Sequence, residues 1–299
     1  MINESDIVIL GHLAKDIIEV DGKSFTSLGG AVFYGGIAGS HMGLKVTVIT
    51  RLKKEDYSLL EVFKKNGITF YVHPSEETSG LRNIYSSKNM EFRAYKPLGF
   101  AGLFTKEEIP DSVKTKIFVI GPIMVGEVDL DLLQYLKKMY PKILCLDAQG
   151  FIRFRDKKKV FYSPLSVKEK KEIISDINVI KVDQTEAEIL TGQKIIGKAA
   201  NDLLTFGPKE ILITHQKGIS VFTSNTSFHF PWRNKNTNGR TGRGDTAFIS
   251  YLGSRLTKSL EESLGFAAAL TSLKLESPGP FSLPLYQVES LIKREYDTK

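Results

Sequence analysis

The sequence predicts a three-layer α/β/α protein with a mainly parallel central sheet and a small additional β-lid. Six short runs are apolar on both faces, as buried parallel strands are. Amphipathic stretches lie between them, and this alternation of strand and helix builds a parallel sheet covered on both sides. The chain has 299 residues, of which 41% are hydrophobic and 25% charged, with no internal repeat or long linker. We therefore expect a single domain over residues 1–299.

The core elements follow one another along the whole chain. The predicted strands are DIVILGH (6–12), KVTVIT (45–50), KIFVIG (116–121), KILCLD (142–147), INVIKV (177–182) and EILITH (210–215). The clearest amphipathic stretches are 55–66, 129–139, 184–191 and 197–206. The only cysteine, Cys145, falls inside a predicted strand, which indicates a buried, unreactive thiol and excludes a disulfide framework.

Two segments alternate polar and apolar residues and differ from the core strands. They cover residues 16–28 and 80–96, with turn signals at Asp21-Gly22 and Lys88-Asn89. This pattern is typical of strands with one solvated face, outside the main sheet. We expect these segments to form a β-lid whose open face is covered by substrate or by the second subunit of a homodimer.

Charge and hydropathy restrict the partners. The net charge is +7, but the lysines are dispersed and alternate with glutamate, as in SVKEKKEI, which is typical of a solvated face rather than a nucleic-acid surface. A small anionic ligand suits this net positive charge.

No apolar run reaches the roughly 18 residues of a membrane span, and the N-terminus lacks signal-peptide features. We expect a cytoplasmic protein without nucleic-acid or membrane partners. The five histidines lack the spacing of a transition-metal site.

The carboxyl ends of parallel strands are where α/β proteins bind ligands. Several loops at these ends carry unusual residues: GHLAKD, which ends in Asp16, LGGAVFYGG (28–36), DAQGFIR (147–153), KVDQTEAEILTG (181–192) and THQKG (214–218). The loop after the first strand has no G-x-G-x-x-G turn, which argues against a dinucleotide oxidoreductase.

The stretch TGRGD (241–245) has the composition of an anion site. Its glycines let consecutive N–H groups converge on one point, and the helix that follows adds its dipole. A carboxylate beside a bound anion is useful if Asp245 takes a proton from a hydroxyl that attacks phosphorus. The alternative is that Asp245 is a helix N-cap and the glycines form a tight turn.

Two segments resemble the signatures of the ribokinase-like (PfkB) carbohydrate kinases. They are GGAVFYGGIAGSHMG (29–43) and NGRTGRGDTAF (238–248), and the resemblance covers nearly the whole chain in the same order. It implies a ribokinase-like fold, ATP and Mg²⁺ as cofactors, and Asp245 as the catalytic base rather than a cap. By position, Gly242, Arg243 and Gly244 match the anion hole, with Arg243 where alanine is usual.

The resemblance also assigns binding residues. Asp16, Gly29 and Gly30 match contacts to sugar hydroxyls. Asp183 and Glu186 match the Asn and Glu that organise the phosphates and magnesium, with Mg²⁺ held near Glu186 through phosphates and water rather than by a direct ligand. Thr214 and Gly218 match the nucleotide loop, which is one residue short here. Residues 265–279 resemble the helix and turn beside the adenine.

Departures from the family pattern bear on the acceptor. Tyr34 replaces an asparagine, Ala14 replaces another, and Gly239-Arg240 replace Asp-Thr, which makes ribose doubtful. Tyr34 is either a substrate contact or a packed core aromatic. Gln149 and Arg153 offer polar groups to a polyol, although Arg153 could instead pair with Asp147 or Asp156.

DAQGFIR together with GRTGRGD resembles the inositol-kinase-like branch of the family. We expect an ATP-dependent phosphotransferase acting on an alcohol group of a sugar or polyol such as myo-inositol. The alternatives are a nucleoside kinase of the same fold and a non-catalytic nucleotide- or sugar-binding regulator.

Overall fold

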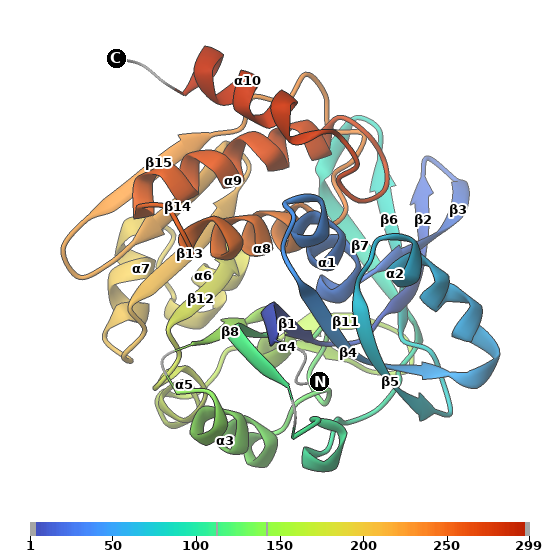
Figure 1. Ribbon diagram of the computed structural model, residues 1–299. Coiled ribbons are helices and arrows are strands. Elements are labelled where there is room, and N and C mark those ends of the chain that lie inside the picture. The colour runs from blue at the N-terminus through green and yellow to red at the C-terminus, as the bar shows by residue number, and fades with distance from the viewer. Residues whose placement is uncertain (1–3, 112, 142, 297–299) are drawn as a thin grey trace.

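A nine-stranded sheet forms the centre of the computed structural model, which describes residues 4–111, 113–141 and 143–296 (Figure 1). The strand order is β15-β14-β13-β12-β9-β8-β1-β4-β5. All neighbours from β13 to β5 are parallel, while β14 and β15 run antiparallel at one edge. The bounds are β1 Glu4–Leu10, β4 Val46–Lys53, β5 Thr69–Ser75, β8 Lys114–Ile120, β9 Leu144–Asp147, β12 Val179–Asp183, β13 Glu210–His215, β14 Gly218–Phe222 and β15 Ser227–Pro231.

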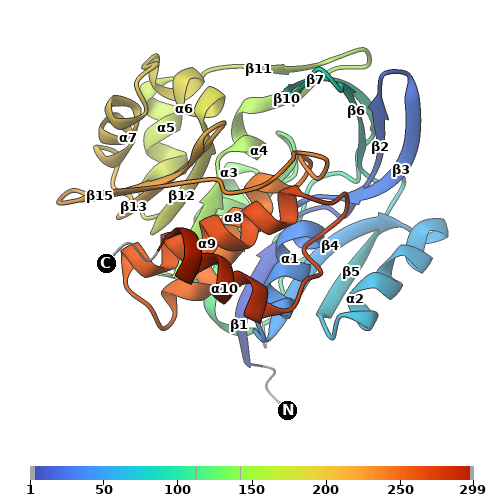
Figure 2. The same ribbon diagram turned by 90° about the horizontal axis from the view of Figure 1, so that it is seen from above.

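Helices cover both faces of this sheet, so the predicted three-layer architecture is confirmed (Figure 2). One layer contains α1 (Ala31–His41), α8 (Arg243–Arg255) and α9 (Leu260–Leu275); the other contains α3 (Leu130–Met139), α5 (Val167–Ile174), α6 (Gln184–Thr191) and α7 (Ile196–Leu204). Strand β1 explains the doubly apolar pattern, because Ile7 and Ile9 pack into the first layer whereas Val8 and Leu10 pack into the second.

Short and peripheral elements differ most from the sequence prediction. Residues 55–66 form no continuous helix: a 3₁₀ segment, Lys54–Leu60, precedes the short α2, Glu61–Lys65. Helix α10 (Leu285–Glu295) packs against α9, and the four-residue helix α4 (Gln149–Ile152) follows β9. In the part of the chain that the structure describes, none of the helices combines the length and apolar character that a bilayer crossing requires.

The two alternating segments lie in a separate four-stranded sheet with the order β3-β2-β6-β7. Its strands are β2 Ala14–Val20, β3 Lys23–Gly29, β6 Gly80–Ser86 and β7 Asn89–Gly99. Strands β2 and β6 are parallel, and each carries an antiparallel hairpin partner. A two-stranded sheet, β10 (Arg153–Arg155) with β11 (Val160–Tyr162), lies near this lid in Figure 2. The lid extends from the same edge of the molecule as the carboxyl ends of the core strands.

Candidate active site

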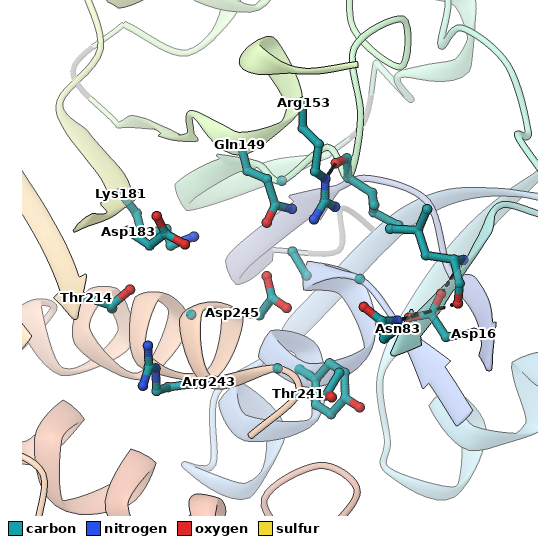
Figure 3. Close-up of a pocket in the computed structure, with 18 of the residues that line it drawn as sticks. Asp16, Asn83, Gln149, Arg153, Lys181, Asp183, Thr214, Thr241, Arg243 and Asp245 are labelled. Atoms are coloured by element: carbon teal, nitrogen blue, oxygen red, sulfur yellow. Dashed lines mark hydrogen bonds between the residues drawn. The ribbon is translucent and has the colours of Figure 1, made fainter. Parts of the chain in front are cut away.

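One pocket at the carboxyl ends of the strands collects residues from the lid, four strand-end loops and the start of α8 (Figure 3). The predicted residues that line it are Asp16, Gly30, Tyr34, Gln149, Arg153, Asp183, Thr214, Gly242, Arg243, Gly244 and Asp245. Gly29, Glu186 and Gly218 do not line this pocket. The structure adds lining residues that the sequence analysis did not select, among them Asn83, Lys181, Arg240 and Thr241.

The TGRGD stretch folds as the start of α8. Gly242 is the N-cap residue, with a left-handed backbone at φ 82°, and a Cβ there would overlap the ring of Tyr34. The first-turn N–H groups are the part of a helix that has no intrahelical acceptor, and they carry the positive end of its dipole. Asp245 lies inside this first turn, which excludes the N-cap alternative, and its carboxylate lies in the middle of the pocket (Figure 3).

A buried lysine, Lys181, packs against the first turn of α8 at Gly244. Lys181 of β12 is 4% exposed, and its Nζ lies 3.0 Å from Asp147 Oδ2 and 3.7 Å from Glu186 Oε2. A Cβ on Gly244 would lie only 3.0 Å from the same Nζ. Burial alone would lower the pKa of Lys181, but the carboxylates of Asp147, Glu186, Asp183 and Asp245 outweigh it and raise the pKa. The sequence feature that could have indicated this buried residue is the presence of a lysine inside the apolar run INVIKV (177–182).

Asp183 and Glu186 form a capping box at the start of α6. Asp183 Oδ1 accepts the Glu186 N–H at 2.8 Å, and Glu186 Oε2 accepts the Asp183 N–H at 2.7 Å. Burial, and next the charge of Asp183, raise the pKa of Glu186. Its Oε1 is buried with no hydrogen-bond partner among the described residues. This unpaired oxygen suits a hard cation such as Mg²⁺ nearby, since such cations prefer oxygen ligands. The described residues include no group of three or more His, Cys, Asp or Glu side chains that could ligate a metal by themselves, so phosphates and water would have to complete its coordination.

Hydrogen-bonding side chains line the opposite half of the pocket. Asp16 is 7% exposed, and its carboxylate accepts the Leu81 N–H at 2.8 Å and the Asn83 amide at 3.4 Å. A Cβ at Gly29 would overlap this carboxylate, so Gly29 makes room for Asp16 without lining the pocket. Asn83 comes from the lid strand β6, and its side chain points toward Asp16 in Figure 3.

Gln149 and Arg153 border the pocket from the segment after β9 (Figure 3). Arg153 is 3% exposed; its Nε donates to the Ile123 carbonyl at 2.8 Å, and its guanidinium lies 5.4 Å from the Tyr95 ring centroid. The acids weighed as its partners have other contacts, since Asp147 accepts from Lys181 and Asp156 accepts two backbone N–H groups. The Ile123 carbonyl and the Tyr95 ring are two of the contacts that hold this guanidinium at the border of the pocket.

Tyr34 and Gly218 have structural surroundings that the sequence did not reveal. Tyr34 is 2% exposed, and its ring packs directly against Gly242, so it supports the loop of residues 239–242 as well as bordering the pocket. Gly218 begins β14 and pairs with Pro231 in the β14–β15 ladder. Thr214, at the end of β13, is the residue of the predicted nucleotide loop that lines the pocket.

The pocket therefore has two chemically different halves with a carboxylate between them. Lys181, Arg243 and the first turn of α8 bring positive charge to one half, which Asp183 also lines, and this half is called the positive half below. Asp16, Asn83 and their neighbours make the other half rich in hydrogen-bonding groups. A positive half for phosphates and a polar half for hydroxyls are the parts that phosphoryl transfer to an alcohol requires. Fold and site together define a small-molecule kinase.

The chain belongs to the pfkB family of carbohydrate kinases, whose model matches residues 29–285. It is a sugar or nucleoside kinase of the ribokinase family, as the resemblance predicted. A ribokinase from Staphylococcus aureus is 36% identical over 126 residues, which are 39% of this chain but only 41% of that protein's length. A cytidine kinase from Thermococcus kodakarensis is 26% identical over 230 residues, 73% of this chain and 76% of that protein.

Solved structures extend the comparison to nearly the full length. A pyrophosphate-dependent kinase in the ribokinase family, complexed with a pyrophosphate analog and myo-inositol, is 33% identical with a TM-score of 0.86. The match covers 95% of this chain and 99% of that one. A variant of a pyrophosphate-dependent myo-inositol-1 kinase is 32% identical, also with a TM-score of 0.86, over 97% and 99% of the two chains.

We predict that Asp245→Asn lowers kcat by at least about 100-fold, because a positioned base contributes roughly 10²–10⁴ to the rate. Donor affinity, measured by calorimetry, should change little, since asparagine has the same shape. Asp129→Asn, at the N-cap of α3 and outside the pocket lining, is the matched control and should keep the wild-type kcat. Turnover close to wild type by the folded Asp245 variant would remove Asp245 from the mechanism.

We also predict that the lid closes on the acceptor, because Asp16, Leu81 and Asn83 of β2 and β6 line the pocket. Amide hydrogen exchange in residues 16–28 and 80–96 should slow when acceptor is added. The β14–β15 hairpin, 218–231, lies at the far edge of the sheet and should be unaffected. Unchanged exchange in the lid at saturating acceptor would count against closure.

Proposed function

We propose that this protein phosphorylates a hydroxyl group of a neutral cyclic polyol, with myo-inositol as the foremost candidate. The observation that carries the proposal is the position of Asp245 between the positive and the hydrogen-bonding halves of one pocket. A hydroxyl held in the polar half would lie between this carboxylate and the donor phosphate, as transfer to an alcohol requires.

The choice of acceptor rests on the donors and acceptors of the polar half. An ionised Asp16 only accepts hydrogen bonds, Arg153 only donates, and Asn83 and Gln149 do both. Because these groups come from the lid and from the segment after β9, they approach a ligand from different sides. A ring with hydroxyls around its whole edge uses such a set better than a ligand with one polar side. The structural neighbours described with myo-inositol support this choice.

The proposed step conserves atoms and charge. Asp245 accepts the proton of the attacking hydroxyl, whose oxygen forms a new bond to phosphorus. The bond between that phosphorus and the bridging oxygen of the donor breaks, and the leaving phosphate keeps the electron pair. Lys181, Arg243 and the N–H groups of the first turn of α8 offset the negative charge on the transferred group. A divalent cation near Asp183 and Glu186 would neutralise further phosphate charge when bound.

We favour inorganic pyrophosphate over ATP as the phosphoryl donor. The positive half carries Arg243 in place of the usual alanine, together with Lys181, and this charge suits a compact polyanion. The guanidinium of Arg243 lies 5.9 Å from the Trp232 ring, whose Nε1 donates to the His215 carbonyl at 2.8 Å. The pyrophosphate dependence of the structural neighbours supports the same donor. ATP, expected from the family resemblance, is the competing donor.

The acceptor is tested with myo-inositol, ribose, adenosine and cytidine. We expect myo-inositol to give the highest kcat/KM by at least about tenfold, because a site built for hydroxyls rejects ligands that leave its groups unpaired. Gln149→Ala and Arg153→Ala should each raise the KM for myo-inositol about tenfold, because the loss of a hydrogen bond to the acceptor costs roughly 1.4 kcal/mol of binding free energy. The KM for the donor should stay within about twofold of the wild-type value.

Gln134→Ala, on α3 away from the pocket lining, is the control and should change neither KM. A preference for cytidine or adenosine would make the protein a nucleoside kinase instead. Ligand binding without turnover of any acceptor would indicate a non-catalytic regulator. If Arg153→Ala lowers only the melting temperature and not the KM ratio, Arg153 holds its loop and does not contact the acceptor.

The donor is tested by measuring turnover with pyrophosphate and with ATP at saturating acceptor. We expect pyrophosphate to have the higher kcat/KM, and Arg243→Ala to raise its KM at least about tenfold, because a hydrogen bond to a charged group contributes roughly 1.5–3 kcal/mol. Arg294→Ala, an exposed arginine of α10, is the matched control. A higher kcat/KM with ATP, together with an unchanged KM in the Arg243 variant, would identify a nucleotide-dependent kinase.

A further inference from the structure

A second buried lysine lies behind the anion loop, defined here as residues 239–242. Lys274 of α9 is 2% exposed, and its Nζ donates to the backbone carbonyls of Gly239 and Thr241. The ammonium also lies 4.9 Å from the centroid of the Tyr34 ring, within the range of a cation–π contact. Two carbonyl oxygens and an aromatic face are the surroundings that proteins provide for a monovalent cation.

These contacts determine how the anion loop is oriented. In a planar trans peptide the C=O of one residue and the N–H of the next point in opposite directions. The carbonyls of Gly239 and Thr241 turn toward Lys274, so the N–H groups of the residues that follow, Arg240 and Gly242, turn away from it. The Arg240 N–H donates to the Thr237 carbonyl at 3.1 Å, whereas Gly242 lines the pocket as the N-cap residue of α8. The Gly239 N–H is bound as well, to the Leu275 carbonyl at 2.8 Å.

The burial of this ammonium has a cost. Desolvation, and next the charge of Arg240, lower the pKa of Lys274 to about 7, whereas Asp245 opposes this shift. An apolar side chain of similar length would fill the same space without that cost, but it would leave the Gly239 and Thr241 carbonyls without their donor. A residue that served packing alone would not need the amine.

We propose that Lys274 is a positioning residue: its tethered amine fixes the anion loop and takes the place that a free monovalent cation would otherwise occupy. It acts on the reaction through the loop, without touching the acceptor. The inference rests on the kinase activity of the proposed function but not on which acceptor or donor is used.

The decisive variant is Lys274→Met, assayed with the best donor and acceptor of the wild-type enzyme. We expect kcat to fall about 100-fold, comparable to the loss of one transition-state donor, with the acceptor KM changed less than about threefold. The melting temperature should fall, because the Gly239 and Thr241 carbonyls lose their donor, so kcat is measured at a temperature where the variant is folded. Lys137→Met is the matched control: this lysine of α3 is 8% exposed and donates to the Glu172 carbonyl, away from the pocket.

Chemical rescue separates positioning from packing. A cavity of about 390 Å³ is bordered by Tyr34, Gly239 and Thr241, so a small cation can approach the two carbonyls when the side chain is truncated. Ammonium or methylammonium chloride should restore the kcat of Lys274→Ala by at least about fivefold, while choline chloride at equal ionic strength should not. Failure of every cation to raise the activity of this folded variant would contradict the tethered-cation role.

Wild-type turnover in potassium, sodium and choline salts provides a test that needs no variant. If Lys274 occupies the cation position, the rates should agree within about twofold, since no free ion has to bind there. Strong stimulation by potassium would overturn the proposal, as would a Lys274→Met variant with nearly wild-type kcat. A wrong donor or acceptor would instead show as absent turnover of the wild-type enzyme.

Discussion

The ammonium of Lys181 is the charge on which the rest of the site depends. The ends of β9 and β12 and the first turns of α6 and α8 bring Asp147, Asp183, Glu186 and Asp245 to the surroundings of Lys181, and like charges at short range repel. The buried cation offsets part of this repulsion. Its position under Gly244 also directs positive charge toward the first turn of α8. The same residue thus supports the proposed base and contributes to the proposed phosphate site.

The anion loop is held by residues that contribute no chemistry of their own. Tyr34 packs under Gly242, Lys274 binds two loop carbonyls, and Tyr85 of the lid bonds Thr241 at 2.9 Å. These contacts come from α1, α9 and β6, so the loop joins both the helical layer and the lid. Because lid residues also line the polar half of the pocket, the Tyr85–Thr241 bond joins that half directly to the anion loop.

The division of the pocket accounts for both substrate proposals. Lys181 and Arg243 lie in the half formed by β12 and α8, which suits phosphate, whereas amide and carboxylate groups of the lid suit hydroxyls. Arg153 is a cation in the polar half, where it can donate to a neutral oxygen. A donor whose charge is concentrated on two phosphates uses the first half fully.

The sequence by itself determined the layered fold, the lid segments and the placement of Asp245 beside a glycine-rich anion loop. These follow from local properties: apolar runs, period-two alternation and the conformational freedom of glycine. Only the tertiary structure decided that Asp245 is not a cap and that Asn83, Lys181 and Lys274 belong to the site or its support. Their roles arise from contacts between residues far apart in the chain, such as Lys274 with Gly239 and Asp16 with Asn83. A local sequence pattern does not predict such partners, because they come into contact only when the strands and helices pack.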